Sequence, residues 1–277
     1  MKETFGVRLL TPALGAEITG LDLSRPLSPG TAAELRRALT NHQVIFFRDQ
    51  ELLPGRQVEL AAAIGEPEPS SHPKFGHLDG HPEVALVVND QDNPPDINVW
   101  HTDLTYLDSP PAACVLYCVE APPLGGDTVW ASMTAAWQAL SLPLQEMLLP
   151  LQARHALRLD GIPLERIRAL DGAQIESFHP VVTRHEDTGL PSLFVNRVYT
   201  RRIEGIDAVE SERLLPVLCS LAERLEFQVR FRWEKGSIAI WDNRATQHYA
   251  VADYFPARRV MHRVSVRGSR PVAWSAK

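Results

Sequence analysis

Short apolar segments of the kind that form β-strands carry most of the hydrophobic pattern of this chain of 277 residues. Apolar and polar residues alternate over 227–233, as in a strand buried on one face, and a turn at 234–236 leads into the apolar run 237–241. Further strands are expected at 44–47, 84–88, 112–119, 128–130 and 259–266, with a hairpin that joins 181–183 to 191–196. Strands this short and this irregularly spaced favour a double-sheet jelly roll over a doubly wound parallel sheet.

Helices are expected near the start of the chain and as insertions between the strands. Leucines and alanines at helical spacing predict helices at 31–41, 55–64, 133–151 and 208–225. The third of these is expected to break and restart at Pro143. Because no internal repeat, low-complexity tract or long linker divides the sequence, we expect one domain over residues 1–277, mainly β with helical insertions.

The charge balance excludes two classes of partner. The chain has 34 acidic and 28 basic side chains and a formal net charge of −6, so it lacks the positive field of a general nucleic-acid or anionic-membrane binder. No apolar stretch reaches the length of a membrane span, and residues 1–18 lack the apolar core of a signal peptide, so a cytoplasmic protein is expected. The three cysteines, Cys114, Cys118 and Cys219, have no paired spacing, and we expect buried free thiols rather than a disulfide framework or a structural zinc site.

A His-x-Asp pattern occurs three times, at 77–79, 101–103 and 185–187. The pattern is weak by itself, but only residues 101–103 are flanked by strand-forming residues. Residues i and i+2 of a strand point to the same side, about 7 Å apart. His101 and Asp103 are therefore able to share one metal ion, and the resemblance described below adds to the expectation that they do.

The last strands suggest a third ligand and two anion-binding residues. Two histidines and one carboxylate leave one face of an octahedral metal open, which suits non-haem Fe(II). His248 follows the strand at 237–241 and a polar turn, where a lone histidine more often has a structural hydrogen-bonding role. In the strand 259–266, Arg259 and Arg263 share one face and are able to bind planar anions, unless this is an edge strand with its charges in water. The alternation alone does not show which face is inward.

Four separated segments carry a more specific signal. They are Trp-His-Thr-Asp at 100–103, Gly-Gly-Asp-Thr-Val-Trp at 125–130, the segment 241–250 and the segment 258–263. In order and spacing they resemble the taurine dioxygenase family of Fe(II)- and 2-oxoglutarate-dependent oxygenases, and the resemblance covers nearly the whole chain. It implies a double-stranded β-helix, which is a cupin-like jelly roll. It also implies Fe(II) bound by His101, Asp103 and His248, with 2-oxoglutarate and O₂ as cosubstrates.

The same resemblance implies roles for the residues around the metal. Thr128 and Arg259 would bind the distal carboxylate of 2-oxoglutarate, and Arg263 would bind the anionic head of the primary substrate. The remaining substrate-binding positions that it implies are His72, Phe75, Ile97, Leu104, Tyr106, Asp160 and Tyr199. Members of the family are usually dimeric or tetrameric, so a homodimer or homotetramer is expected.

Several substrate-side positions depart from taurine dioxygenase itself. Phe75 stands where a tyrosine is expected, and Ile97 where an asparagine would contact the amine of taurine. Asp160 and Gly161 replace a serine and a phenylalanine. The apolar Ile97 suits a less polar substrate, whereas an inward-facing Asp160 would pair with a cationic amine, so the two clues conflict.

The retained arginine at position 263 and the resemblance together predict hydroxylation of a small organic anion, an alkyl sulfonate such as taurine or a sulfate ester. The reaction would release succinate and CO₂, and its product would collapse to an aldehyde plus sulfite or sulfate. Open alternatives are the same chemistry on an aryloxyalkanoate or another carboxylate, and a non-catalytic cupin-like binding protein. A zinc hydrolase is a weaker alternative because the chain has no His-Glu-x-x-His motif. Residues 70–98, rich in Pro, Gly and Asp, are expected to form a mobile loop over the site.

Overall fold

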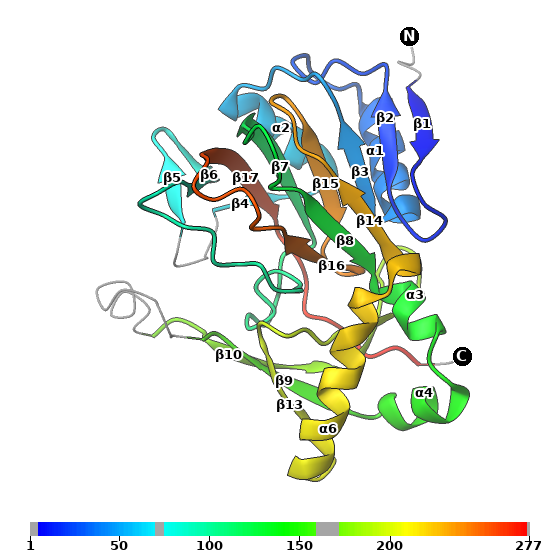
Figure 1. The fold of residues 1–277 in the computed structure, drawn as a ribbon. Helices are drawn as coiled ribbons and strands as arrows, with labels where there is room; N and C mark the ends of the chain where they lie inside the picture. Colours follow the sequence, from blue (N-terminus) through cyan, green and yellow to red (C-terminus); the bar gives the residue numbers. More distant parts are fainter. Residues whose placement is uncertain (1–4, 70–74, 159–171, 276–277) are drawn as a thin grey trace.

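Two facing β-sheets form the upper half of the molecule in Figure 1. The computed structural model describes residues 5–69, 75–158 and 172–275. Within those residues the larger sheet has nine strands, antiparallel except for the parallel pair β2 and β3. Its order is β1 (Gly6–Leu9), β2 (Ala16–Thr19), β3 (Val44–Phe47), β15 (Ile238–Asp242), β7 (Ala113–Glu120), β17 (Arg259–Val266), β6 (His81–Asn89) and β5 (Gly76–Leu78), with β4 (Pro67–Glu68) paired to β17.

The smaller sheet packs against one face of the larger one. It contains β14 (Gln228–Phe231), β8 (Thr128–Ser132) and β16 (Thr246–Ala250), all antiparallel. Aromatic side chains fill the space between the sheets: the Phe46 ring stacks on Phe231 at 4.2 Å between centroids and meets Trp130 edge-on at 5.3 Å. The two sheets form the double-sheet jelly roll that the strand pattern predicts.

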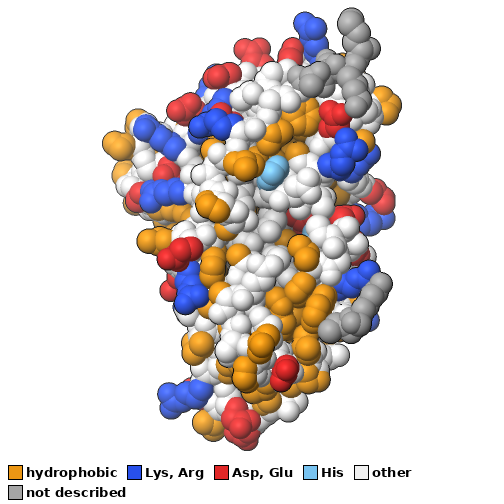
Figure 2. Space-filling model, turned by 90° about the vertical axis from the view of Figure 1, so that its right-hand side faces the viewer, with side chains coloured by type: hydrophobic (Ala, Val, Ile, Leu, Met, Phe, Trp, Pro, Cys, Tyr) orange, Lys and Arg blue, Asp and Glu red, His pale blue; other side chains and the backbone are white. Residues whose placement is uncertain are grey.

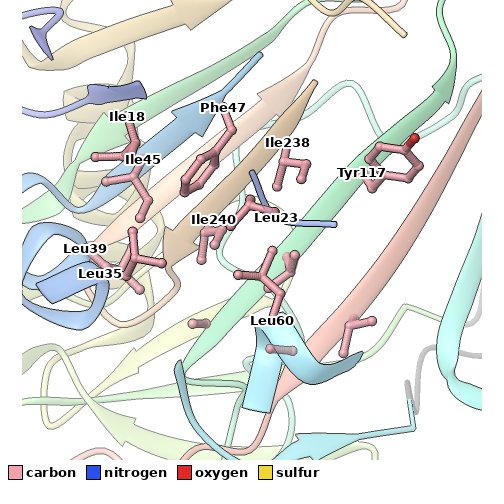
Figure 3. Close-up of a cluster of buried hydrophobic side chains, with 14 of the residues drawn as sticks. Ile18, Leu23, Leu35, Leu39, Ile45, Phe47, Leu60, Tyr117, Ile238 and Ile240 are labelled. Atoms are coloured by element: carbon pink, nitrogen blue, oxygen red, sulfur yellow. The ribbon is translucent and has the colours of Figure 1, made fainter. Parts of the chain in front are cut away.

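Two helices, α1 (Pro29–His42) and α2 (Pro54–Ile64), cover the opposite face of the larger sheet (Figure 1). Figure 3 shows leucines of these helices against Ile45, Phe47, Ile238 and Ile240. Since alternate residues of β3 enter the two different cores, this strand has no polar face, and its continuous apolar run is explained. The predicted helices at 31–41 and 55–64 are confirmed to within two residues.

Strand β17 lies inside the larger sheet, between β7 and β6. The edge-strand alternative for its arginines is therefore wrong. Val264 and Val266 face the core under the helices, whereas Arg259 and Arg263 are buried on the other face, toward the smaller sheet. The smaller sheet packs on the face of β17 that carries the arginines, and the sequence of β17 alone does not specify this packing.

A long insertion between β8 and β14 forms the lower half of the molecule in Figure 1. Its helices and helical turns are α3 (Met133–Gln138), α4 (Leu142–Leu148), α6 (Ala208–Cys219), η1 (Ser220–Glu223) and η2 (Leu225–Phe227). Its strands are β9 (Gln152–Ala156), β10 (Glu176–Pro180), β11 (Val182–Arg184), β12 (Pro191–Leu193) and β13 (Thr200–Glu204). The hairpin expected around residues 187–189 is β11 and β12.

Two predicted segments differ from the structure in extent. The helix expected over 208–225 ends at Cys219 and continues as 3₁₀ turns, since Pro216 supplies no backbone N–H to its last turns. The mobile loop expected over 70–98 is wrong for much of its length, because β5 and β6 lie within it. Apolar residues 84–88 of β6 pair with β17, which fixes this part in the sheet. Residues 70–74 lie outside the described residues.

The cysteine expectation is confirmed. Cys114, Cys118 and Cys219 are free and buried. Among the described residues we also find no helix with both the length and the apolar character needed to cross a bilayer.

A buried ion-pair network closes the turn between β15 and β16. The Asp242 carboxylate accepts hydrogen bonds from His185 Nε2 at 2.9 Å and from Arg244 at 2.7 and 3.0 Å. Arg244 also pairs with Asp187 at 2.7 Å. His185, Asp187 and Asp242 lie close enough together to suggest a metal site, but the Arg244 guanidinium already forms ion pairs with both carboxylates. We therefore interpret this cluster as structural.

The network predicts a pH-dependent stability. Burial raises the pKa of Asp242, but hydrogen bonds from His185 and Arg244 outweigh burial and hold this pKa well below 3.8. A lowered folded-state pKa contributes stability above pH ~4 that is lost as the pH falls through the folded-state pKa. Asp242→Asn should lower the free energy of unfolding in urea by about 3 kcal/mol at pH 7, because Arg244 and His185 lose a buried anionic partner.

The control is Asp187→Asn, which removes an exposed partner of the same arginine and should cost less than about 1 kcal/mol. The difference in free energy of unfolding between the wild type and Asp242→Asn should become smaller toward pH 2. A difference that does not change with pH would contradict this account.

Candidate active site

A cavity of about 110 Å³ lies between the two sheets. The larger sheet contributes side chains of β7, β15 and β17, and the smaller sheet contributes side chains of β8 and β16. Nine of the residues predicted from the sequence line it: Phe75, Ile97, His101, Asp103, Thr128, Tyr199, His248, Arg259 and Arg263.

Three potential metal ligands converge at one wall of the cavity. His101 and His248 face each other across an isolated antiparallel bridge, with backbone N–H to O=C distances of 3.0 and 2.8 Å. The Asp103 carboxylate oxygens lie 3.7 Å from His101 Nε2 and 3.9 Å from His248 Nε2. One donor atom from each residue lies within 4.8 Å of the other two. Two imidazoles and one carboxylate form a donor set that suits Fe(II).

Asp103 reaches this position from a turn, so the expectation that it shares a strand with His101 is wrong. Residues 103–106 form a turn in which Leu104 has a φ of 53°. The side chain of Asn243 holds the turn: it accepts from Asp103 N at 2.9 Å and donates to Asp103 O at 3.1 Å. These two hydrogen bonds hold residues 103–106 in a turn, although the local sequence favours a strand.

The histidines are held in the form that binds metals. His101 Nδ1 lies 2.8 Å from Val99 O and donates to it, which leaves a lone pair on Nε2, the nitrogen nearest Asp103. Burial lowers the pKa of His101, and burial together with His101 lowers the pKa of His248 to about 3. Both rings are therefore neutral at pH 7, as metal ligation requires.

Arg263 contacts the carboxylate of this trio. Its NH2 lies 3.1 Å from Asp103 Oδ2 and 3.3 Å from the Cys114 sulfur. Burial lowers the pKa of Arg263, but the Asp103 carboxylate outweighs burial and raises it, so the guanidinium stays charged. Its Nε is buried without a hydrogen-bond partner in the described part of the chain. The sequence did not predict the contact with Asp103.

Arg259 is a second buried cation that faces the cavity. It is 5% exposed, and its Nε has no hydrogen-bond partner among the described residues, nor do those residues supply it with a carboxylate. The Tyr254 side chain hydrogen-bonds with Arg259. Burying a cation without a carboxylate partner is still costly, so such a group is suited to bind an anion. Gly126 packs closely beside Arg259. It has a φ of +70°, and a Cβ there would lie 2.9 Å from Pro122, 3.1 Å from the ring of Tyr254 and 3.5 Å from Arg259 Cδ.

The substrate-side predictions divide into three groups. Phe75, Ile97 and Tyr199 line the cavity. Leu104 and Tyr106 do not line it in the described structure; they pack with Tyr199 in a buried cluster, with the two tyrosine rings 5.4 Å apart. The two remaining positions, 72 and 160, lie outside the described residues.

Several groups that support the site were missed by the sequence analysis. Thr105, in the turn that carries Asp103, has its hydroxyl 2.9 Å from His155 Nδ1 and 3.1 Å from Asn196 Nδ2. His179 Nε2 donates to Thr105 O at 2.9 Å. These partners come from the insertion, and no local motif links them to residues 103–106. They anchor the turn between the insertion and the sheets.

Comparison with known proteins identifies the family. Residues 6–265 match the model of the family described as taurine catabolism dioxygenase TauD, TfdA family. An alpha-ketoglutarate-dependent sulfate ester dioxygenase from Pseudomonas putida is 40% identical over 270 residues, 94% of this chain and 88% of that protein.

Solved structures agree with this assignment. A taurine dioxygenase from Burkholderia xenovorans superposes with a TM-score of 0.85 at 38% identity, over 97% of this chain and 93% of that one. AAD-2 in complex with Mn(II) and N-oxalylglycine superposes with a TM-score of 0.79 at 25% identity, over 97% of this chain and 99% of that one. The chain therefore belongs to the TauD, TfdA family and is a non-haem iron dioxygenase that uses Fe(II), 2-oxoglutarate and O₂.

Proposed function

We propose that this enzyme hydroxylates an alkyl sulfate ester or alkyl sulfonate at the carbon that bears the sulfur-containing group. The observation that carries the proposal is that two buried arginines on one face of β17 line the same cavity as His101, Asp103 and His248. One oxygen atom of O₂ enters the substrate and the other enters succinate, as 2-oxoglutarate loses CO₂. The hydroxylated product then collapses to an aldehyde plus sulfate or sulfite. Family membership excludes the alternative of a non-catalytic cupin-like binding protein.

In this proposal His101, Asp103 and His248 hold Fe(II). The bound metal and its cosubstrates supply the oxidising power needed to functionalise an unactivated carbon. The chain itself fixes the ligands: Val99 O sets the tautomer of His101, and Arg263 holds one oxygen of the Asp103 carboxylate. The lining of the cavity is largely apolar, which disfavours water around the proposed metal.

Arg259 and Thr128 bind the distal carboxylate of 2-oxoglutarate. Both are buried and both line the cavity. A guanidinium offers several N–H donors in one plane, and a threonine hydroxyl adds one more, which together match the geometry of a carboxylate. The unpartnered Nε of Arg259 supports this role.

Arg263 binds the anionic head of the primary substrate with the donors that Asp103 does not use. Apolar side chains that include Phe75, Val87 and Ile97 line much of the remaining cavity, beside the polar Asn89 and Asp96, and this apolar part suits an alkyl tail. The activity in the name of the Pseudomonas putida relative, a sulfate ester dioxygenase, supports the same substrate class. The remaining substrate contacts proposed are His72, Asp160 and Tyr199. The implied contacts of Leu104 and Tyr106 are not proposed, because both side chains are buried outside the cavity. An aryloxyalkanoate or other carboxylate is the alternative substrate.

We also propose that residues 1–277 form one domain and that the protein acts in the cytoplasm as a homodimer or homotetramer. The free cysteines agree with a reducing compartment. Leu142, which is 71% exposed, and Met147 on α4 offer apolar surface for self-association. Figure 2 shows apolar side chains gathered on the lower half of the face that carries this helix.

The metal role predicts a loss of binding as well as of activity. His248→Ala should weaken Mn(II) binding, followed by electron paramagnetic resonance, by about 100-fold or more, and should abolish succinate formation with Fe(II). His42→Ala, at the end of α1 and outside the cavity, is the matched control and should change neither. Undiminished Mn(II) binding by His248→Ala would refute this assignment.

The cosubstrate role predicts an effect on 2-oxoglutarate alone. Arg259→Gln should raise KM for 2-oxoglutarate by about 10- to 100-fold, because a charged hydrogen-bond donor is lost, and Mn(II) binding should stay intact. Arg259→Lys should restore only part of the affinity, since a point charge cannot bind bidentately. The proposal would have to be abandoned if the KM of Arg259→Gln matched the wild-type value.

The substrate role is tested with a panel of alkyl sulfates, alkyl sulfonates and aryloxyalkanoates. Arg263→Gln should lower kcat/KM for the preferred anion by about 10- to 100-fold. The slow formation of succinate without primary substrate should persist, which separates this role from the support of Asp103. Wild-type kcat/KM on every anion would argue against the contact, and a wild-type preference for aryloxyalkanoates would favour the alternative substrate.

A further inference from the structure

We propose that Trp233 is a positioning residue for the cosubstrate: its indole N–H orients the Thr128 hydroxyl so that the hydroxyl proton points at the distal carboxylate of 2-oxoglutarate. This inference rests on the proposed function, because it requires Thr128 to bind that carboxylate.

Strand pairing brings the two residues together. Trp233 follows β14, whose Phe231 is paired with Thr128 of β8. Trp233 Nε1 donates to Thr128 Oγ1 at 2.9 Å, and the two residues are 3% and 2% exposed. The bond is therefore shielded from water, and water cannot replace it readily if the N–H is removed.

The direction of this bond determines what the hydroxyl can do next. An indole N–H can only donate, whereas a hydroxyl has one proton and two lone pairs. Thr128 must therefore use a lone pair toward Trp233, and its proton is left to find another acceptor. The described residues offer none to it, and Thr128 lines the cavity. An anion in the cavity is the acceptor that completes the arrangement.

The same indole also flanks the second group that binds the carboxylate. The Arg259 guanidinium carbon lies 5.8 Å from the centroid of the Trp233 ring, and the negative face of the ring attracts the cation. Two neighbouring tryptophans differ: the Nε1 atoms of Trp130 and Trp241 are buried without a partner in the described residues. Of these three tryptophans, Trp233 is the one whose indole N–H donates to Thr128.

The test is a double-mutant cycle of Trp233→Phe and Thr128→Val. Phenylalanine keeps a ring in the core and removes the N–H. Two affinities are measured: 2-oxoglutarate, from the visible charge-transfer band in anaerobic Fe(II) titrations, and N-oxalylglycine, by calorimetry with Mn(II). Trp233→Phe should weaken both by about 3- to 10-fold, with kcat at saturating 2-oxoglutarate and KM for the primary substrate unchanged. In the Thr128→Val background, Trp233→Phe should have almost no further effect on either affinity.

The controls address folding and the phenylalanine substitution itself. Trp137→Phe changes a buried tryptophan in the core of the insertion, outside the cavity, and should leave both affinities unchanged. If Trp233→Phe unfolds, 3-benzothienylalanine at position 233 replaces only the N–H by sulfur and gives the same readout.

Two results would overturn this inference and leave the proposed function standing. They are unchanged affinities in the Trp233 variants, and a loss of affinity in the double variant that equals the sum of the losses, as free energies, in the two single variants. Wild-type affinity in Thr128→Val would instead overturn the role of Thr128 in the proposed function.

Discussion

The backbone bridge between His101 and His248 is the contact on which the rest of the site depends. Two reciprocal hydrogen bonds hold the residues opposite each other and bring their imidazole rings to within 4.1 Å between centroids. The third donor, Asp103, comes from a turn that Asn243 anchors, and Asn243 belongs to the connection between β15 and β16, the strand that carries His248. Backbone pairing and the side-chain amide of Asn243 thus hold the three residues of the proposed metal site in place. Such pre-organisation is what a reactive metal centre requires.

Placing two cations between packed sheets has a functional consequence. Arg263 is compensated by Asp103, whereas Arg259 has no carboxylate partner among the described residues. A buried cation without a carboxylate partner destabilises the ligand-free protein, and an anion that binds in the cavity reduces that penalty. We therefore interpret the face of β17 as the source of anion selectivity. Because Arg263 contacts Asp103, an anion bound by Arg263 would lie beside the proposed metal position.

Elements that depend on a local residue pattern were predicted well from the sequence. Features that depend on contacts with residues far away in the sequence were predicted less well. Strand β3 and helix α1 were predicted to within two residues, because an apolar run and a capped amphipathic helix are local signals. The inward face of β17 could not be predicted, since valines and arginines alternate and the second sheet decides between them. Asp103 was misplaced on a strand because its turn depends on Asn243, 140 residues away. The donor to Thr128 was missed for the same reason: the pairing of β14 with β8 is not visible in either segment alone.

The central claim is that His101, Asp103 and His248 hold one Fe(II) in a cavity where Arg259 binds 2-oxoglutarate. Anaerobic titration of the purified protein with Fe(II) and 2-oxoglutarate, followed by visible absorption, tests it most directly. The account predicts a charge-transfer band that requires both components, saturates at one Fe(II) per chain and shifts when an alkyl sulfate is added. No band under these conditions, or an unaltered band in Asp103→Ala, would contradict it.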